Sequence, residues 1–203
     1  MTNTEAAPAA EKVELKLNLR YLSALTRFAT KNDIRYFLEG VAIRIEAGKK
    51  IVAATDGHRL GILELPVVEG EPENLDLIIP RHVLKMADKA APYRRHDELE
   101  RLEICEGRCT LFWSKTDGIT FAPIDAKFPR IEAVMPPETT GEAASFNLLY
   151  LGDFSKFGEA CLGHPVFPDI QSNGLRAALV KIIGFPEFTG VVMPMDPRRT
   201  VVS

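Results

Sequence analysis

The same order of elements, a strand, a helix and then further strands, occurs twice in succession in the first 123 residues. No other feature of the sequence restricts the fold as strongly. Period-two alternation predicts the strands, and apolar residues three and four positions apart predict the helices. Two successive β-α-β-β-β units predict an α+β fold in which both helices lie side by side and strands from the two halves join common sheets. The first unit is predicted at 13–17, 19–31, 36–46 and 51–65, and the second at 75–79, 80–90, 99–105, 109–114 and 118–123.

A third unit of the same kind follows in the last third of the chain. It has no fourth unit to pair with, and a lone half-domain leaves one sheet edge uncovered. Its strand, helix and three further strands are predicted at 145–149, 152–161, 165–170, 176–183 and 189–195. Composition divides the chain into a disordered tail at 1–12, a complete domain at 13–136, a linker at 137–144 and a single half-domain at 145–203.

Small and polar residues interrupt two apolar strands between Thr55 and Arg59. The interruption contains Asp56, Gly57 and His58, and the apolar pattern resumes at Leu60. We expect the backbone to bend or bulge there before the strand continues. A kink of this kind marks either a functional site or a corner of the fold.

Composition excludes several classes of protein. With 46% hydrophobic and 26% charged residues, the 203-residue chain is typical of globular proteins. No stretch approaches the roughly 18 consecutive apolar residues of a membrane helix, and the N-terminus does not resemble a secretion signal, so we expect a cytoplasmic protein and no membrane partner. Cys105 and Cys109 flank a predicted turn without a second Cys/His pair, which favours reduced thiols over a metal site.

Basic residues form a stripe on each of the first two predicted helices. Such stripes are usually solvated faces, but their presence on both helices favours one shared, negatively charged partner. The net charge of −3 does not exclude one basic face on an acidic body. The first stripe is Arg20, Arg27 and Lys31, and the second is Arg81, Lys85 and Lys89, with Arg94 and Arg95 just beyond it.

The sequence does not favour catalysis. Asp56 and His58 could form an acid/base pair, but neighbouring positions on a strand point their side chains in different directions, and neither a nucleophile nor a metal-ligand set accompanies them. An unrelated enzyme would need a deep polar pocket, which no spacing predicts. We therefore expect neither enzymatic activity nor a cofactor.

Five short motifs resemble the bacterial sliding clamp family, the β subunit of DNA polymerase III. In order and spacing, residues 15–136 resemble the family's middle domain and 145–195 the second half of its last domain. The resemblance implies the DNA-clamp fold, built here of three half-domains. Counterparts of the first domain and of the first half of the last domain are not found, so the family's mode of ring closure does not carry over. The motifs lie at 33–40, 54–60, 78–81, 128–129 and 191–195.

The resemblance also implies two sites. One is a pocket for short linear peptides of polymerases and repair proteins, with adaptable apolar walls and a few polar groups. The other is a helix-lined surface that contacts the phosphates of duplex DNA without reading bases. The implied pocket residues are Leu38, Thr55, Gly57, His58, Arg59, Leu60, Pro136, Val191, Met193, Pro194 and Met195. The implied DNA-contacting residues are Arg20, Arg27, Lys31, Arg35, Arg81, Lys85, Lys89, Arg94 and Arg95.

These sites predict a replication or repair processivity factor that assembles into a homo-oligomer. A ring of the family's size has twelve half-domains, so four copies of this chain would supply them, and a tetramer or a dimer is expected. The alternative is a clamp-derived adaptor or competitor that binds peptides without encircling DNA. Asp196 stands where the family commonly has a basic residue, and the extra tail at 197–203 could line the pocket.

Overall fold

The computed structural model describes residues 12–91 and 99–196. Most of the expected tail at 1–12, the basic residues Arg94 and Arg95, and the tail at 197–203 lie outside the described residues. The described part has the α+β composition that the sequence predicts. None of its helices is long and apolar enough to cross a membrane.

Each unit places its helix before three consecutive strands. The first unit comprises β1 (Val13–Leu17), α1 (Leu19–Leu25), the 3-10 helix η1 (Tyr36–Leu38), β2 (Gly40–Glu46), β3 (Lys49–Thr55) and β4 (Arg59–Pro66). The second comprises β5 (Leu75–Pro80), α2 (Arg81–Ala90), β6 (Glu100–Cys105), β7 (Arg108–Phe112) and β8 (Gly118–Phe121). After the 3-10 helix η2 (Ile131–Ala133), the third comprises α3 (Leu148–Leu162), β9 (Pro168–Gln171), β10 (Ala178–Ile182) and β11 (Phe188–Val192).

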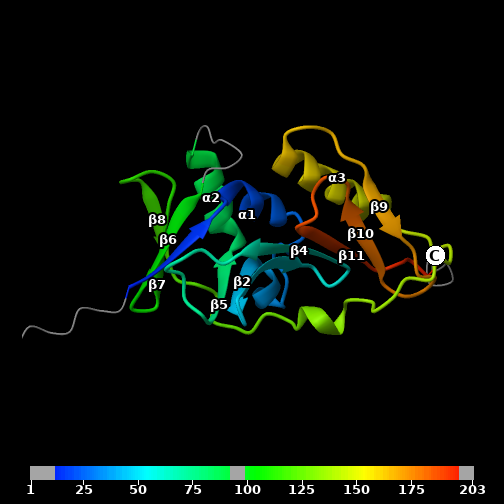
Figure 1. The fold of residues 1–203 in the computed structure, drawn as a ribbon, viewed down its shortest axis with the longest axis horizontal. Helices are drawn as coiled ribbons and strands as arrows, with labels where there is room; N and C mark the ends of the chain where they lie inside the picture. Colours follow the sequence, from blue (N-terminus) through cyan, green and yellow to red (C-terminus); the bar gives the residue numbers. More distant parts are fainter. Residues whose placement is uncertain (1–11, 92–98, 197–203) are drawn as a thin grey trace, which may run out of the picture.

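The strands form two antiparallel sheets, and both contain strands of more than one unit. One sheet has the order β1-β6-β7-β8 and the other has the order β5-β2-β3-β4-β11-β10-β9 (Figure 1). The strands β1 and β5 are thus exchanged between the first two units, which confirms the expected joining of sheets. Strand β11 pairs with β4, with Leu60 opposite Val191, so the third unit extends the sheet of the first.

The three helices lie on one side of the sheets and cover the main core. Helix α1 packs against both α2 and α3. Beneath it, the rings of Phe28, Phe154, Phe157 and Phe188 are fully buried and contact one another at centroid distances of 4.4 to 6.2 Å. This aromatic cluster joins the first and third units, because Phe28 follows α1 whereas the others belong to α3 and β11.

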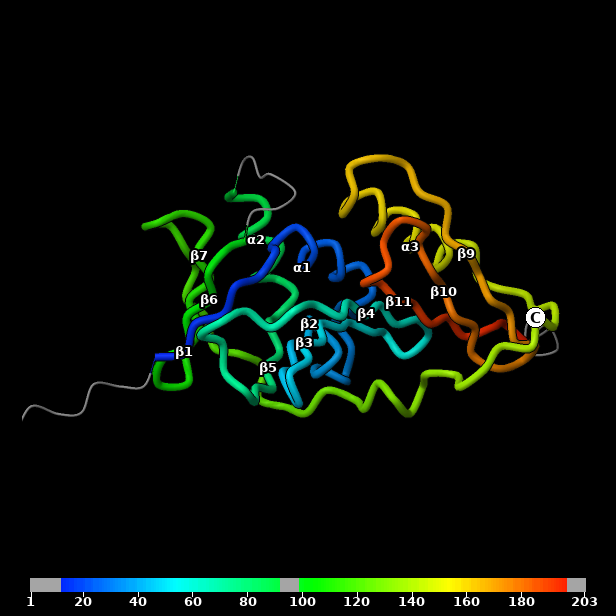
Figure 2. The backbone as a smooth tube through the Cα atoms, in the orientation of Figure 1, coloured from blue at the N-terminus to red at the C-terminus, as the bar shows by residue number. Residues whose placement is uncertain are grey.

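An extended segment covers the opposite face of the long sheet. After β8 the chain runs along the side away from the helices before it reaches α3 (Figures 1 and 2). Phe128, 4% exposed, packs there in a second apolar cluster with Leu60, Ile62 and Val191. We call residues 122–147 the connecting segment. It spans both β4 and β11, and it therefore forms one wall of any site at their junction.

The predicted helix at 19–31 is too long, because α1 ends at Leu25. The next three amides, from Thr26 to Phe28, each donate to the carbonyl three residues earlier in the chain instead of four. The Thr26 hydroxyl also bonds to the Ser23 carbonyl. These bonds end the regular helix, so Arg27 and Lys31 lie beyond it rather than on its stripe.

Two further expectations are wrong in detail. The interruption after Thr55 is no bulge within a continuing strand, because the chain reverses there and Thr55 pairs with Leu60. The strand expected at 145–149 is reduced to one isolated bridge between Ser145 and Met195. Helix α3 begins at Leu148 because the side chain of Asn147 caps it by accepting a hydrogen bond from the Leu149 amide at 2.9 Å.

Candidate functional site

A pocket of about 250 Å³ lies where the β3–β4 turn, the end of β11 and the connecting segment meet. Eight of the eleven residues predicted for a peptide pocket line it. They are Leu38, Thr55, Gly57, His58, Arg59, Leu60, Val191 and Met193. The floor is apolar, since Leu38, Leu60 and Val191 are at most 4% exposed.

The remaining lining residues were not predicted for this site. Phe37 and Arg35 come from the segment around η1, and the rest come from the connecting segment. The motif at 128–129 was among those that resemble the clamp family, but only the folded chain shows that the connecting segment crosses the junction of β4 and β11. The additional residues are Arg35, Phe37, Phe128, Pro129, Arg130, Ile131 and Val134.

Three predicted residues do not line the pocket. They are Pro136, Pro194 and Met195. The amide of Met195 donates to the carbonyl of Ser145 at 2.7 Å, so this end of the chain is tied to the residues before α3. The pocket is therefore bounded by Met193 and Val134, both of which are partly exposed.

Asp56 builds the tight turn between β3 and β4. Its Oδ1 accepts hydrogen bonds from the amides of His58 at 2.9 Å and Arg59 at 3.0 Å. Gly57, between them, has a φ of +88°, which favours glycine. The Asp56 carboxylate therefore holds the turn through the backbone amides of His58 and Arg59.

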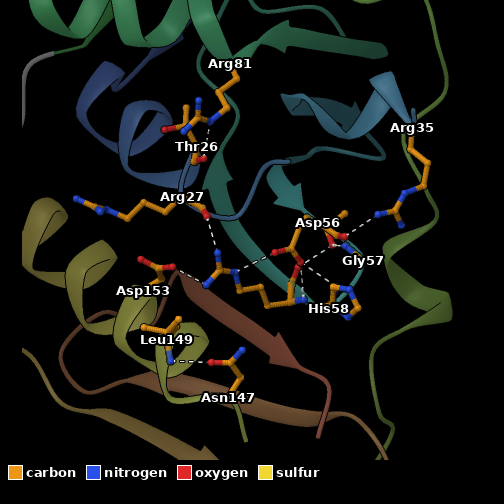
Figure 3. A network of polar contacts seen from close by, with 12 residues as sticks. Thr26, Arg27, Arg35, Asp56, Gly57, His58, Arg81, Asn147, Leu149 and Asp153 are labelled. Carbon is orange, nitrogen blue, oxygen red and sulfur yellow. Dashed lines mark hydrogen bonds and ion pairs between the residues drawn. The ribbon is translucent and has the colours of Figure 1, made fainter. Parts of the chain in front are cut away.

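Arg35 lies in the pocket wall and not in the helix layer where the DNA-contacting set placed it. Its guanidinium donates to both oxygens of Asp33, at 3.1 and 2.8 Å, and to the Asp56 carbonyl at 3.1 Å. The hydrogen bonds from Arg35 lower the pKa of Asp33 to about 2. Arg35 thus links the segment before η1 to the β3–β4 turn at the mouth of the pocket (Figure 3).

Arg59 connects the pocket wall to the helix layer. Its Nη1 lies 2.5 Å from Asp153 Oδ2 on α3, and its Nη2 donates to the Arg27 carbonyl at 3.1 Å. The guanidinium also lies over the ring of Tyr150, 4.5 Å from its centroid, and its Nε is 3.2 Å from Asp56. With its side chain only 11% exposed, Arg59 holds the turn, the end of α1 and α3 together.

His58 lies at the exposed rim of the pocket. Its ring stacks on Tyr150 with the centroids 5.9 Å apart. Its carbonyl accepts a hydrogen bond from the Met193 amide at 2.8 Å, which continues the pairing of β4 with β11. The pocket therefore combines an apolar floor with polar groups at the rim, and this arrangement suits an extended peptide with apolar side chains.

The basic residues predicted for the helix layer divide into two groups. Arg27, Lys31, Lys85 and Lys89 are exposed. Arg20 and Arg81 are half-buried and bonded within the protein, through Nε to the carbonyls of Ala160 and Thr26 respectively. The second pair therefore fixes α1 against its neighbours.

Three of these cations lie close together where the end of α1 meets the start of α2. Partial desolvation of its ammonium group lowers the pKa of Lys85, the charges of Arg27 and Arg81 lower it further, and Asp88 opposes this. Desolvation is the main cause of this lower pKa, and the two arginine charges add to it. We call the exposed cations Arg27, Lys31, Lys85 and Lys89 the basic surface, and Arg35 lies apart from them in the pocket wall.

The described residues contain no cluster of three or more His, Cys, Asp or Glu side chains that could hold a metal ion.

The sequence matches a family model described as the central domain of the DNA polymerase III beta subunit, over residues 16–130. It is 34% identical over 124 residues to the beta sliding clamp of Haemophilus influenzae, which covers 60% of this chain and 32% of that protein. It is 27% identical over 165 residues to the beta sliding clamp of Pseudomonas aeruginosa, an alignment that covers 79% of this chain and 41% of that protein. The chain thus spans 32% to 41% of the length of these relatives.

Solved structures show the same fold. The DNA polymerase III subunit beta of Pseudomonas aeruginosa aligns with 97% of this chain and 69% of its own length, at a TM-score of 0.69 and 19% identity. The DNA polymerase sliding clamp of Bacillus subtilis aligns with 95% of this chain and 67% of its own length, at a TM-score of 0.70 and 14% identity. The clamp fold expected from the sequence is therefore confirmed. Because the family model matches more than half of the chain, this protein belongs to the family of the DNA polymerase III beta subunit.

Proposed function

We propose that this chain is a sliding-clamp-type processivity module of DNA replication or repair. It binds short peptides of polymerases or repair proteins in the pocket, and it contacts duplex DNA through the basic surface of the helix layer. Membership of the clamp family supports both activities. The proposal includes self-association into a dimer or tetramer and a cytoplasmic location.

The pocket carries this proposal. Its walls come from three parts of one chain, namely the β3–β4 turn, β11 and the connecting segment. Arg35 and Arg59 hold the turn in place through Asp33, Asp56 and Asp153. A preformed apolar pocket lowers the ordering cost of binding an extended peptide, which favours measurable affinity for a single short motif.

Peptide binding is tested with a fluorescently labelled peptide from a polymerase's clamp-binding segment, measured by anisotropy. Met193 is 43% exposed at the rim, so Met193→Lys should keep the fold while placing a charge against the apolar peptide. We expect affinity to fall by about ten-fold or more. Met86→Lys on α2, where Met86 is 56% exposed, is the matched control and should bind as the wild type does. Equal affinities for all three proteins would contradict the pocket assignment.

DNA binding is tested with a duplex of arbitrary sequence at low and moderate salt. The double variant Arg27→Glu/Lys85→Glu reverses two exposed charges of the basic surface and should abolish association, while peptide affinity stays unchanged. The double variant Lys49→Glu/Lys115→Glu changes the net charge equally at two exposed positions, the start of β3 and the connection between β7 and β8, and should leave DNA binding nearly unchanged. If both double variants lose DNA binding to the same extent, net charge rather than this surface is responsible.

The second candidate is an adaptor or competitor that binds clamp-seeking peptides without encircling DNA. The observation that favours it is that one chain supplies the whole pocket, while Arg20 and Arg81 are bonded within the protein. Peptide binding together with no detectable association with duplex DNA at low salt would establish this alternative.

A further inference from the structure

The first two units exchange the strands that lead into their helices. Strand β1 leads into α1 but pairs with β6, the first strand after α2. Strand β5 leads into α2 but pairs with β2, the first strand after α1. In each unit, therefore, the strand before the other unit's helix covers the outer edge of the first strand after the helix: β1 covers β6, and β5 covers β2.

The third unit has the same two parts without this pairing. Strand β9 follows α3 and is the terminal strand of the seven-stranded sheet. The residues that lead into α3, 143–147, take part in a single bridge, between Ser145 and Met195. Within the described ranges, the third unit thus has an open sheet edge at β9 and a segment, 143–147, that could pair with such an edge. In the first two units the corresponding edge and strand are paired.

The exposure of apolar side chains agrees with a missing neighbour. The side chains of Asn18 and Asn147 cap α1 and α3 by accepting from the amides of Tyr21 and Leu149, and the first helical residue follows each asparagine. Leu19 at this position in α1 is 0% exposed, whereas Leu148 in α3 is 80% exposed. Phe167, immediately before β9, is 83% exposed. A leucine and a phenylalanine exposed beside an open sheet edge are typical of an interaction surface.

We propose that two copies of this chain pair at this surface about a two-fold axis. Residues 143–147 of each copy add to the β9 edge of the other, and their α3 helices pack together as α1 and α2 do. A second copy is the occupant because it carries the same segment 143–147 and the same open β9 edge. In one two-fold contact, the segment of each copy therefore pairs with the β9 edge of the other. The unit so completed reproduces the strand exchange of the first two units.

Charge supports the same occupant. At the start of the first unit's helix, the Leu19 amide donates a hydrogen bond to Glu100 of β6 at 2.8 Å, which places a carboxylate at the N-terminal end of α1. In the proposed pair, β9 takes the place of β6. Its exposed Asp169 would then lie near the N-terminal end of the other copy's α3, where a negative charge is favoured.

The test is the solution mass across the micromolar range, by multi-angle light scattering, with amide hydrogen exchange of β9. The wild type should form dimers or multiples of dimers, and its β9 amides should exchange faster on dilution. Leu148→Lys should weaken self-association about ten-fold or more, and so should Phe167→Lys, which tests the surface from the strand side. The control is Ile34→Lys, at a position 96% exposed beside the peptide pocket, and it should associate as the wild type does.

A wild type that stays monomeric overturns the inference. An oligomer whose β9 amides exchange freely, and whose mass neither variant changes, overturns it as well. The inference deepens the self-association in the proposed function, but it needs neither peptide nor DNA. Peptide and DNA binding are measured in separate assays. A protein that binds neither could still form this dimer, and a monomer could still bind peptide or DNA.

Discussion

Gly61 and Gly190 face each other across the junction of β4 and β11, where the first and third units join. A Cβ atom on Gly61 would lie 2.5 Å from the ring of Phe28, and one on Gly190 would collide with the ring of Phe154. The two rings themselves contact each other at a centroid distance of 4.9 Å. The two glycines thus let the aromatic cluster rest directly on the backbone of the sheet, which closes the contact between the units.

We expect Gly61→Ala and Gly190→Ala each to lower the free energy of unfolding by about 2 kcal/mol, because an added methyl group overpacks a full core. Urea denaturation measures the change. The control is Gly152→Ala in α3, where nothing lies within 4 Å of the added atom. That variant should be unchanged or up to about 1 kcal/mol more stable, since alanine favours the helix. Unchanged stability of both sheet variants would show that the junction is loosely packed.

The β3–β4 turn depends on Gly57 for two separable reasons. Its φ of +88° is strained for alanine, and a Cβ would lie 2.7 Å from Arg35 Nη1. Gly70 has a φ of +89° with nothing within 4 Å of an added Cβ. Both Gly→Ala variants should therefore lose about 1–2 kcal/mol of stability to backbone strain. Only Gly57→Ala should also weaken peptide binding, because it displaces the Arg35 side chain from the pocket wall; anisotropy with the labelled peptide measures this.

The buried ion pair of Lys50 and Glu71 ties the connection after β4 to β1. Both side chains are 2% exposed, with Nζ 2.6 Å from Oε1, and Glu71 also accepts the amide of Lys16 at 2.8 Å. Lys50→Met would leave a buried carboxylate without its cation, and we expect a loss of about 3 kcal/mol in the free energy of unfolding. Lys49→Met removes a neighbouring, exposed pair with Glu64 and should cost less than about 1 kcal/mol. A similar loss for both variants would mean that Lys50 is better solvated than the structure shows.

The three cysteines should differ sharply toward a thiol reagent at neutral pH. Burial raises the pKa of Cys109 to about 11 and that of Cys161 to about 12, whereas Cys105 is exposed. The thiolate is the reactive form, so only Cys105 should react in the native protein, and all three should react after denaturation. Cys105→Ser should then leave almost no fast-reacting thiol. Rapid native labelling of Cys161 would contradict the packing of α3 against the core.

The regular elements could be predicted because their signals are local. The alternation of Val13 to Leu17 and the i, i+4 spacing along α2 give both the type and the bounds of those elements. Where a local polar bond competes with the apolar pattern, prediction fails. The hydroxyl of Thr26 ends α1 early, and the Asn147 side chain converts an expected strand into the start of α3. Asn147 was detectable in principle, since Asn18 caps α1 in the same way.

Most of the pocket's turn and of its floor could be named from the sequence, since the turn motif and β11 carry distinctive residues. Its other wall could not, because the position of Phe128 depends on how the connecting segment crosses two strands that lie more than a hundred residues apart in sequence. The exchange of β1 and β5, the facing glycines 61 and 190, and the place of Arg35 at the pocket likewise follow from pairings between distant strands. Local periodicity determines which residues form strands and helices, whereas only the packing of the whole chain decides which edges meet, and the sites lie where those edges meet.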